Sequence, residues 1–193
     1  MEKLILASGS PRRKEIMGIF GKPFEVITSE IEEPVNELDP PAVTVMALAL
    51  EKALDVASRV EVGALVIGAD TLVYCDGYMG KPADETDARQ MLERLQGRSH
   101  QVYTGIAVIR AGTDEKVVDA VCTTVQMKPL SSDLIQSYLD SGEPMGKAGA
   151  YAIQGKGTLL IEGIQGDYFN VVGLPAQRLG ELLEKHFGYR LMA

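Results

Sequence analysis

Two serines and two arginines follow the first apolar run of the sequence, where a helical pattern begins at Pro11. They are Ser8, Ser10, Arg12 and Arg13. A helix N-terminus presents unpaired N–H groups and a partial positive charge, both of which favour anions. Guanidinium groups match phosphate oxygens with paired donors, and hydroxyls add further donors. This join predicts a polyphosphate site, although a serine-capped helix with two solvated arginines explains the pattern equally well.

A carboxylate stands at the end of a second apolar run. Asp70 and Thr71 follow the apolar residues 64–69, and in open α/β sheets ligand sites gather outside the carboxyl ends of strands. A carboxylate there can orient or deprotonate a water molecule, or hold a metal ion. Asp70 is therefore the candidate base and metal ligand, and a turn-forming aspartate is the alternative.

Three weaker signals fit a complex of a metal ion and a triphosphate. The acidic stretch 30–33, with Glu33 at its end, offers oxygens that suit Mg²⁺ or Mn²⁺. Lys52 on an expected helix, and Lys81 between Gly80 and Pro82, can act as point charges for phosphates. For each of them, a solvated side chain is the alternative.

The stretch 149–157 is rich in glycine, which lets a backbone approach a ligand closely. Within it, Gln154 carries both a donor and an acceptor, as the edge of a pyrimidine base requires. A glycine-rich surface loop is the alternative. Gly155-Lys156 resembles the end of a P-loop, but Ala150 and Gly157 break the G-x-x-x-x-G-K-[ST] pattern.

The elements that must position these residues follow from hydrophobic periodicity and turn signals. Strands are expected at 4–8, 24–28, 64–74, 101–110, 116–127 and 159–161, and helices at 11–20, 40–59, 84–95, 132–139 and 175–187. In the helix at 40–59, Val43, Ala47, Leu50 and Leu54 fall on one face. The order predicts an α/β or α+β domain, residues 1–193, around a mixed and strongly twisted sheet.

The composition limits the class of protein. The 193 residues are 46% hydrophobic and 24% charged, which is typical of a folded globular chain. A net charge of −8 argues against broad nucleic-acid binding but not against a small phosphate site. No apolar run approaches the roughly 20 residues of a membrane span, and the N-terminal segment is too short for a signal peptide. We expect a cytoplasmic protein with no membrane or nucleic-acid partner.

Six sequence blocks, in order and without large gaps between residue 4 and about 187, resemble the Maf family of nucleoside triphosphate pyrophosphatases. The blocks are LASGSPRR (6–13), GADT (68–71), GKP (80–82), LQGRSHQVYTGIAV (95–108), KAGAYAIQGKG (147–157) and GDYFNVVGLP (166–175). The resemblance implies an inosine-triphosphatase-like fold with a cleft between two lobes. It implies hydrolysis of a nucleoside triphosphate to the monophosphate and pyrophosphate, with Mg²⁺ or Mn²⁺ as cofactor.

The resemblance also implies roles for single residues. Asp70 matches the family's proton acceptor, and we expect it to share the metal ion with Glu33. The residues that match phosphate contacts or line the same cleft are Ser8, Arg12, Arg13, Lys52 and Lys81. Those that match the dTTP and UTP branch are Arg12, Thr71 and Gln154. One departure is Gly146, where an acidic residue is expected before the KAGAY string.

The expected activity is therefore hydrolysis of dTTP and UTP, and of modified pyrimidine triphosphates. One alternative is a pyrophosphatase for 7-methyl-GTP or other modified nucleotides, although GADT contrasts with the GSDQ-like string of that branch. A second is a non-catalytic, nucleotide-sensing regulator, because the family is linked to septum formation and arrest of cell division. A third is an acidic interaction module, which leaves the phosphate-type residues unexplained. A homodimer is expected by analogy alone.

Overall fold

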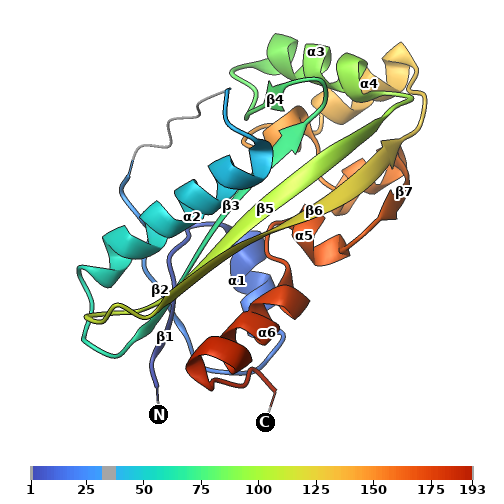
Figure 1. Cartoon of the computed structure of the whole chain (residues 1–193). Helices are drawn as coiled ribbons and strands as arrows, with labels where there is room; N and C mark the ends of the chain where they lie inside the picture. The colour runs from blue at the N-terminus through green and yellow to red at the C-terminus, as the bar shows by residue number, and fades with distance from the viewer. Residues whose placement is uncertain (1, 32–37, 193) are drawn as a thin grey trace.

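A single mixed sheet runs through the computed structural model, which describes residues 2–31 and 38–192 (Figure 1). Its strand order is β2-β1-β3-β5-β6-β7, with β4 paired to β3. β1 pairs in parallel with β2 and β3, and the other pairs are antiparallel. The strands are β1 (Leu4–Leu6), β2 (Glu25–Val26), β3 (Leu65–Tyr74), β4 (Tyr78–Met79), β5 (Ser99–Arg110), β6 (Lys116–Met127) and β7 (Ile161–Gln165).

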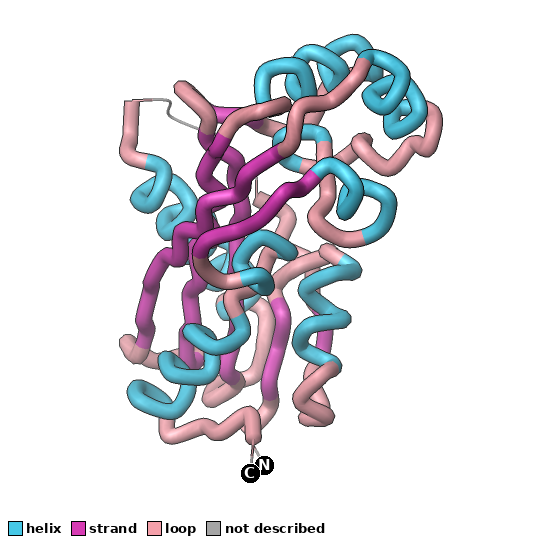
Figure 2. The backbone as a smooth tube through the Cα atoms, turned by 90° about the vertical axis from the view of Figure 1, so that its right-hand side faces the viewer, coloured by secondary structure: helices cyan, strands magenta, loops and turns pink. Residues whose placement is uncertain are grey.

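Helices lie on both faces of this sheet, and the two chain ends lie at the same end of the molecule (Figures 1 and 2). The helices are α1 (Pro11–Gly18), α2 (Pro41–Ala57), α3 (Glu85–Leu95), α4 (Ser132–Leu139), α5 (Tyr168–Val172) and α6 (Ala176–Phe187), with 3₁₀ turns η1 (Ala148–Ala150) and η2 (Gly155–Leu160). Within residues 2–31 and 38–192, no helix is long and apolar enough to cross a membrane.

The helix α2 packs close to the sheet because two glycines lie beneath it. A Cβ atom at Gly68 would lie 2.2 Å from the carbonyl oxygen of Ala49, and one at Gly105 would lie 2.1 Å from that of Val45. The face of α2 that is buried consists of Thr44, Val45, Leu48, Ala49, Lys52, Ala53 and Val56. Our predicted face was wrong, since Val43 and Leu54 are 47% and 44% exposed. Because α2 lies so close to the glycines of the sheet, its alanine-rich side faces the sheet instead.

The opposite face of the sheet carries two core clusters, one toward each end. One cluster joins α1 and α6 to β1 and β3, and it includes Leu6, Met17 and Leu179. The other joins α3 and α4 to the far ends of β5 and β6, with Leu92 and Met127 at its centre. The two clusters form the two lobes between which a ligand cleft was expected.

Most of the expected elements are confirmed, as is the mixed α/β class. Asp84 caps α3 by accepting from the Asp87 N–H, and Ser131 caps α4 by accepting from Leu134. The strand expected at 24–28 is reduced to β2, and the one at 159–161 begins only at Ile161. α5 was not predicted, because a helix of 5 residues is too short to show a period.

Candidate active site

One edge of β3 has a gap in its pairing, and the cleft opens there. Along this edge β1 pairs with β3 only as far as Ile67, and β4 begins at Val73. On the other edge, β5 pairs with β3 along its whole length. Within the described chain, residues 68–72 therefore have no strand partner on the first edge. A cleft of ≈ 820 Å³ lies against the gap and is lined by residues from both faces of β3.

Asp70 and Thr71 lie in this gap, in the middle of β3. Asp70 is thus not at the end of its own strand, as the sequence suggested, because the strand continues to Tyr74. It lies instead beyond the carboxyl end of the neighbouring strand β1. Successive residues of a strand point to opposite faces, so the two side chains reach the cleft from opposite sides of the sheet.

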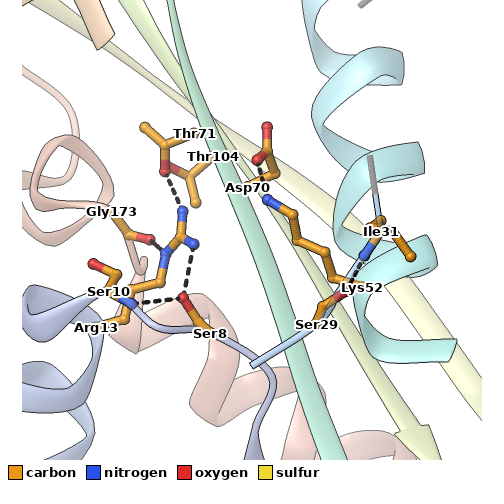
Figure 3. A network of polar contacts seen from close by, with 10 residues as sticks. All are labelled: Ser8, Ser10, Arg13, Ser29, Ile31, Lys52, Asp70, Thr71, Thr104 and Gly173. Carbon is orange, nitrogen blue, oxygen red and sulfur yellow. Dashed lines mark hydrogen bonds and ion pairs between the residues drawn. The ribbon is translucent and has the colours of Figure 1, made fainter. Parts of the chain in front are cut away.

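Asp70 faces α2 and forms an ion pair with Lys52 (Figure 3). The Lys52 Nζ donates to Asp70 Oδ1 at 2.7 Å, and the two residues are only 8% and 7% exposed. Removing either charge from water is costly, and the opposite charge at this distance offsets that cost. Lys52, expected as a phosphate contact, is therefore first of all the partner of the candidate base.

Arg13 lies on the other face and is held from three directions (Figure 3). Its Nε donates to the carbonyl oxygen of Gly173 at 2.7 Å, Nη1 to Ser8 Oγ at 3.1 Å and Nη2 to Thr71 Oγ1 at 3.0 Å. Ser8 Oγ also accepts from the Ser10 N–H at 3.3 Å. Since a hydroxyl accepts twice and donates once, the Ser8 proton remains able to donate to a ligand. Arg13 is thus a fixed positive charge in the cleft.

A second wall of the cleft is built around Glu143, which sequence reasoning missed. Its carboxylate accepts from the Gly157 N–H at 2.9 Å, the Lys156 N–H at 3.0 Å and the Tyr138 hydroxyl at 3.0 Å. Burial alone would raise the pKa of Glu143, but these hydrogen bonds hold it below its ordinary value. The carboxylate therefore anchors the start of η2, directly after Gln154.

Lys147 is a further cation of the cleft that sequence reasoning missed. Its ammonium donates to the carbonyl oxygen of Glu143. Burial, and then the positive charge of Arg12, lower the pKa of Lys147 despite the opposing effect of Glu143. Two cations from different walls are thus close enough to repel, and an anion between them would relieve this. The position of Lys147 at the head of the KAGAY block was the available signal.

The remaining predicted residues are divided between the cleft and the undescribed part of the chain. Lys81 and Gln154 line the cleft, and Gly80 beside Lys81 accepts from the Gly149 N–H at 3.0 Å. Gly146 also lines it, with φ +74, a left-handed conformation that favours glycine over the acidic residue expected there. Glu33 lies outside the described residues.

The carboxylates that line the cleft, among the described residues, are Glu15, Asp70 and Glu143. Across residues 2–31 and 38–192, no group of three or more His, Cys, Asp or Glu could hold a metal ion on its own. In nucleotide sites, however, Mg²⁺ is bound by one or two carboxylates together with substrate phosphates. Asp70 at the floor of the cleft meets that smaller requirement.

Curated proteins are similar to this chain over its whole length. A protein named dTTP/UTP pyrophosphatase from Alkaliphilus metalliredigens (strain QYMF) is 50% identical over 192 residues, which cover 100% of both chains. One of the same name from Clostridioides difficile (strain 630) is 52% identical over 97% of both chains.

Solved structures are more distant. A HAM1 protein from Coxiella burnetii is 16% identical, with a TM-score of 0.49 over 66% of this chain and 73% of that one. At that TM-score the likeness carries no functional argument. The family model described as Maf-like protein, by contrast, matches residues 3–186. The chain therefore belongs to the Maf family.

Proposed function

We propose that this protein hydrolyses dTTP and UTP, and modified pyrimidine triphosphates, to the monophosphate and pyrophosphate. The names of its relatives at about half identity support this assignment. The observation that carries it is the buried ion pair of Asp70 and Lys52 at the gap in β3, across the strand from the fixed guanidinium of Arg13. A proton acceptor and a cationic phosphate site thus share one cleft.

In the proposed reaction, a water molecule attacks the α-phosphorus in line with the bridging oxygen to the β-phosphorus. The new oxygen–phosphorus bond forms as the bridging bond breaks, and pyrophosphate leaves. Asp70 accepts the proton of the attacking water, and Lys52 holds that carboxylate in place. Positive charge fixed in advance stabilises the departing group. Arg12, Arg13, Lys81 and Lys147 provide this charge.

A divalent cation, Mg²⁺ or Mn²⁺, is proposed as the cofactor, with Asp70 and Glu33 as its protein ligands. When bound, such an ion neutralises phosphate charge and lowers the pKa of the attacking water. The carboxylate of Asp70, which faces a cleft large enough for a triphosphate, supports this assignment.

We propose that the pyrimidine base of the nucleotide is selected by Arg12, Gln154 and Thr71. The amide of Gln154 presents a donor and an acceptor, and the anchoring of η2 by Glu143 limits its movement. Thr71 differs from the other two, because its hydroxyl already contacts Arg13. We therefore propose that Thr71 acts through the position of that arginine. A single domain, a cytoplasmic location and a homodimer remain proposals from sequence.

The experiment is pyrophosphate release from dTTP, UTP, CTP, GTP and 7-methyl-GTP, each with Mg²⁺, with Mn²⁺ and with a chelator. We expect release from dTTP and UTP that the chelator abolishes. Release from 7-methyl-GTP alone would contradict the pyrimidine assignment. No release from any triphosphate would contradict the enzyme assignment and favour a nucleotide-sensing role.

A further inference from the structure

The contact between Arg13 and Thr71 is the first link of a longer chain of hydrogen bonds. Thr104 of β5 lies directly opposite Thr71 in the register of β3 and β5, and their hydroxyl oxygens are 2.9 Å apart. Thr104 Oγ1 also donates to the backbone carbonyl oxygen of Asn170 at 2.9 Å. A hydroxyl has one proton, and that of Thr104 is used here. Thr71 must therefore donate to Thr104 and accept from Arg13, so the direction of every link is determined.

The end of this hydrogen-bond series that is farthest from Arg13 is also held by several hydrogen bonds. Asn170 Nδ2 donates to the carbonyl oxygen of Val102 at 3.0 Å and to Thr123 Oγ1 at 2.9 Å. The Thr123 hydroxyl in turn donates to the carbonyl oxygen of Asp167 at 2.9 Å. Thr104, Thr123 and Asn170 are all 0% exposed. Because these bonds are buried in the protein, each is stronger than it would be at the surface.

The short helix α5 reaches Arg13 by two routes. One runs from Asn170 through the two threonines to Nη2, and the other is direct, from the carbonyl oxygen of Gly173 to Nε. A helix of 5 residues has little stability alone, so its bonds to the sheet hold both routes. No role was predicted for the residues of the GDYFNVVGLP block, which contains α5.

We propose that Thr104 and Asn170 are positioning residues that hold the Arg13 guanidinium for the pyrophosphate end of the substrate. This inference rests on the proposed function. Without the Thr104 hydroxyl, the proton of Thr71 has no acceptor beneath it, and the hydroxyl can rotate. It can then turn its proton toward Arg13 Nη2, which weakens one of the contacts that orient the guanidinium.

The test is a double-mutant cycle on the full chain, with the affinity for inorganic pyrophosphate, measured by calorimetry, as its readout. The variants are Thr104→Val, Arg13→Lys and their combination. We expect Thr104→Val, which keeps the shape of the side chain, to weaken binding about tenfold. In the Arg13→Lys background it should change binding by less than about twofold, because the guanidinium that it positions is already absent.

Two controls separate positioning from loss of structure. Thr104→Ser keeps the hydroxyl and should bind pyrophosphate as the unmodified chain does. Thr44→Val removes a buried hydroxyl from α2, on the other face and outside the cleft, where it bonds to Tyr78, and it should leave the affinity unchanged. If Thr104→Val does not fold, Thr71→Val breaks the same link from the cleft end.

The outcomes distinguish this inference from the proposed function. The positioning role would be overturned if the losses of pyrophosphate affinity caused by Thr104→Val and Arg13→Lys multiply in the double variant. It would also be overturned if Thr104→Ser binds pyrophosphate as weakly as Thr104→Val does. Pyrophosphate release from dTTP by the unmodified chain tests the proposed function separately. A coupled cycle without any turnover would support the positioning role and contradict the enzyme assignment.

Discussion

Asp70 and Thr71 are neighbours in β3, yet the two faces of the strand hold their polar groups in different ways. Toward α2, the Asp70 carboxylate pairs with the opposite charge of Lys52 at 2.7 Å, among apolar residues such as Ala49, Ala53 and Val66. Toward α5, a guanidinium is held by a series of neutral hydrogen bonds. The first arrangement rests on an opposite charge, and the second rests on several hydrogen bonds from different segments.

The two arrangements suit two different requirements of a pyrophosphatase. A proton acceptor must keep its charge where it is buried, and a counter-charge provides this directly. A phosphate site needs a cation whose position does not change as charge develops on the leaving group. The gap in β3 lets one substrate contact both faces. Four sets of variants test this difference between the two faces.

The largest effect is expected from Asp70→Asn on the α2 face. The carboxamide keeps the shape of the side chain but cannot take the proton of the attacking water. We expect kcat for dTTP to fall roughly 10³-fold with little change in KM, within the range of general base catalysis. Steady-state pyrophosphate release measures both constants, and an unchanged kcat would show that Asp70 is not the base.

Lys52→Met tests whether charge pairing holds the α2 face. It leaves the Asp70 carboxylate buried without its counter-charge, and we expect the free energy of unfolding in urea to fall by about 4 kcal/mol. The double variant with Asp70→Asn removes both charges and should recover most of that loss. A single variant as stable as the double one would mean that the ion pair does not stabilise this face.

The stability of the opposite face should depend on pH, because a neutral histidine is buried there. His100 lies on the same face of β5 as Thr104 by strand alternation, and its Nε2 lies 2.7 Å from the Tyr151 hydroxyl oxygen. Burial lowers the pKa of His100 from 6.5 to about 4. Between these values the unfolded chain binds a proton that the folded chain does not. The free energy of unfolding should therefore fall by about 3 kcal/mol as the pH drops through this interval.

Urea unfolding at several pH values between 7 and 4 measures this loss. Carboxylates also titrate toward the acid end, so His100→Gln is the control, and the difference between the two chains isolates the histidine. Below about pH 4 that difference should become constant. Parallel curves for the two chains across the whole interval would contradict a neutral buried histidine.

The smallest of the four effects is expected at Gly105. An added Cβ would lie 2.1 Å from the Val45 carbonyl oxygen, which forces α2 away from the sheet. We expect Gly105→Ala to lower the free energy of unfolding by about 2 kcal/mol, as overpacking does. Because Lys52 moves with α2, kcat should fall while pyrophosphate affinity, which depends on the Arg13 face, is kept.

Gly163→Ala is the matched control, since a Cβ at this strand position meets nothing within 4 Å. It should leave stability and kcat close to those of the unmodified chain. Loss of pyrophosphate affinity in Gly105→Ala would contradict the independence of the two faces.

Much of this protein was predictable from local patterns in the sequence. The periods of β3, β5, β6 and α6 and the caps at Asp84 and Ser131 determine most elements, because these signals lie within a few residues of one another. The strand–helix join, singled out by its residue types, also carries Ser8 and Arg13 into the cleft.

Which partners these residues have depends on the tertiary structure alone. The pairing of Lys52 with Asp70, the buried side of α2 and the gap in β3 all depend on which elements become neighbours. The hydrogen bond from Thr104 to Asn170 joins residues 66 positions apart, and that from Arg13 to Gly173 joins residues 160 apart. No local period records such contacts, since their energy appears only when distant segments are buried against one another. The chemical types present are thus a property of the sequence, and their partners are a property of the fold.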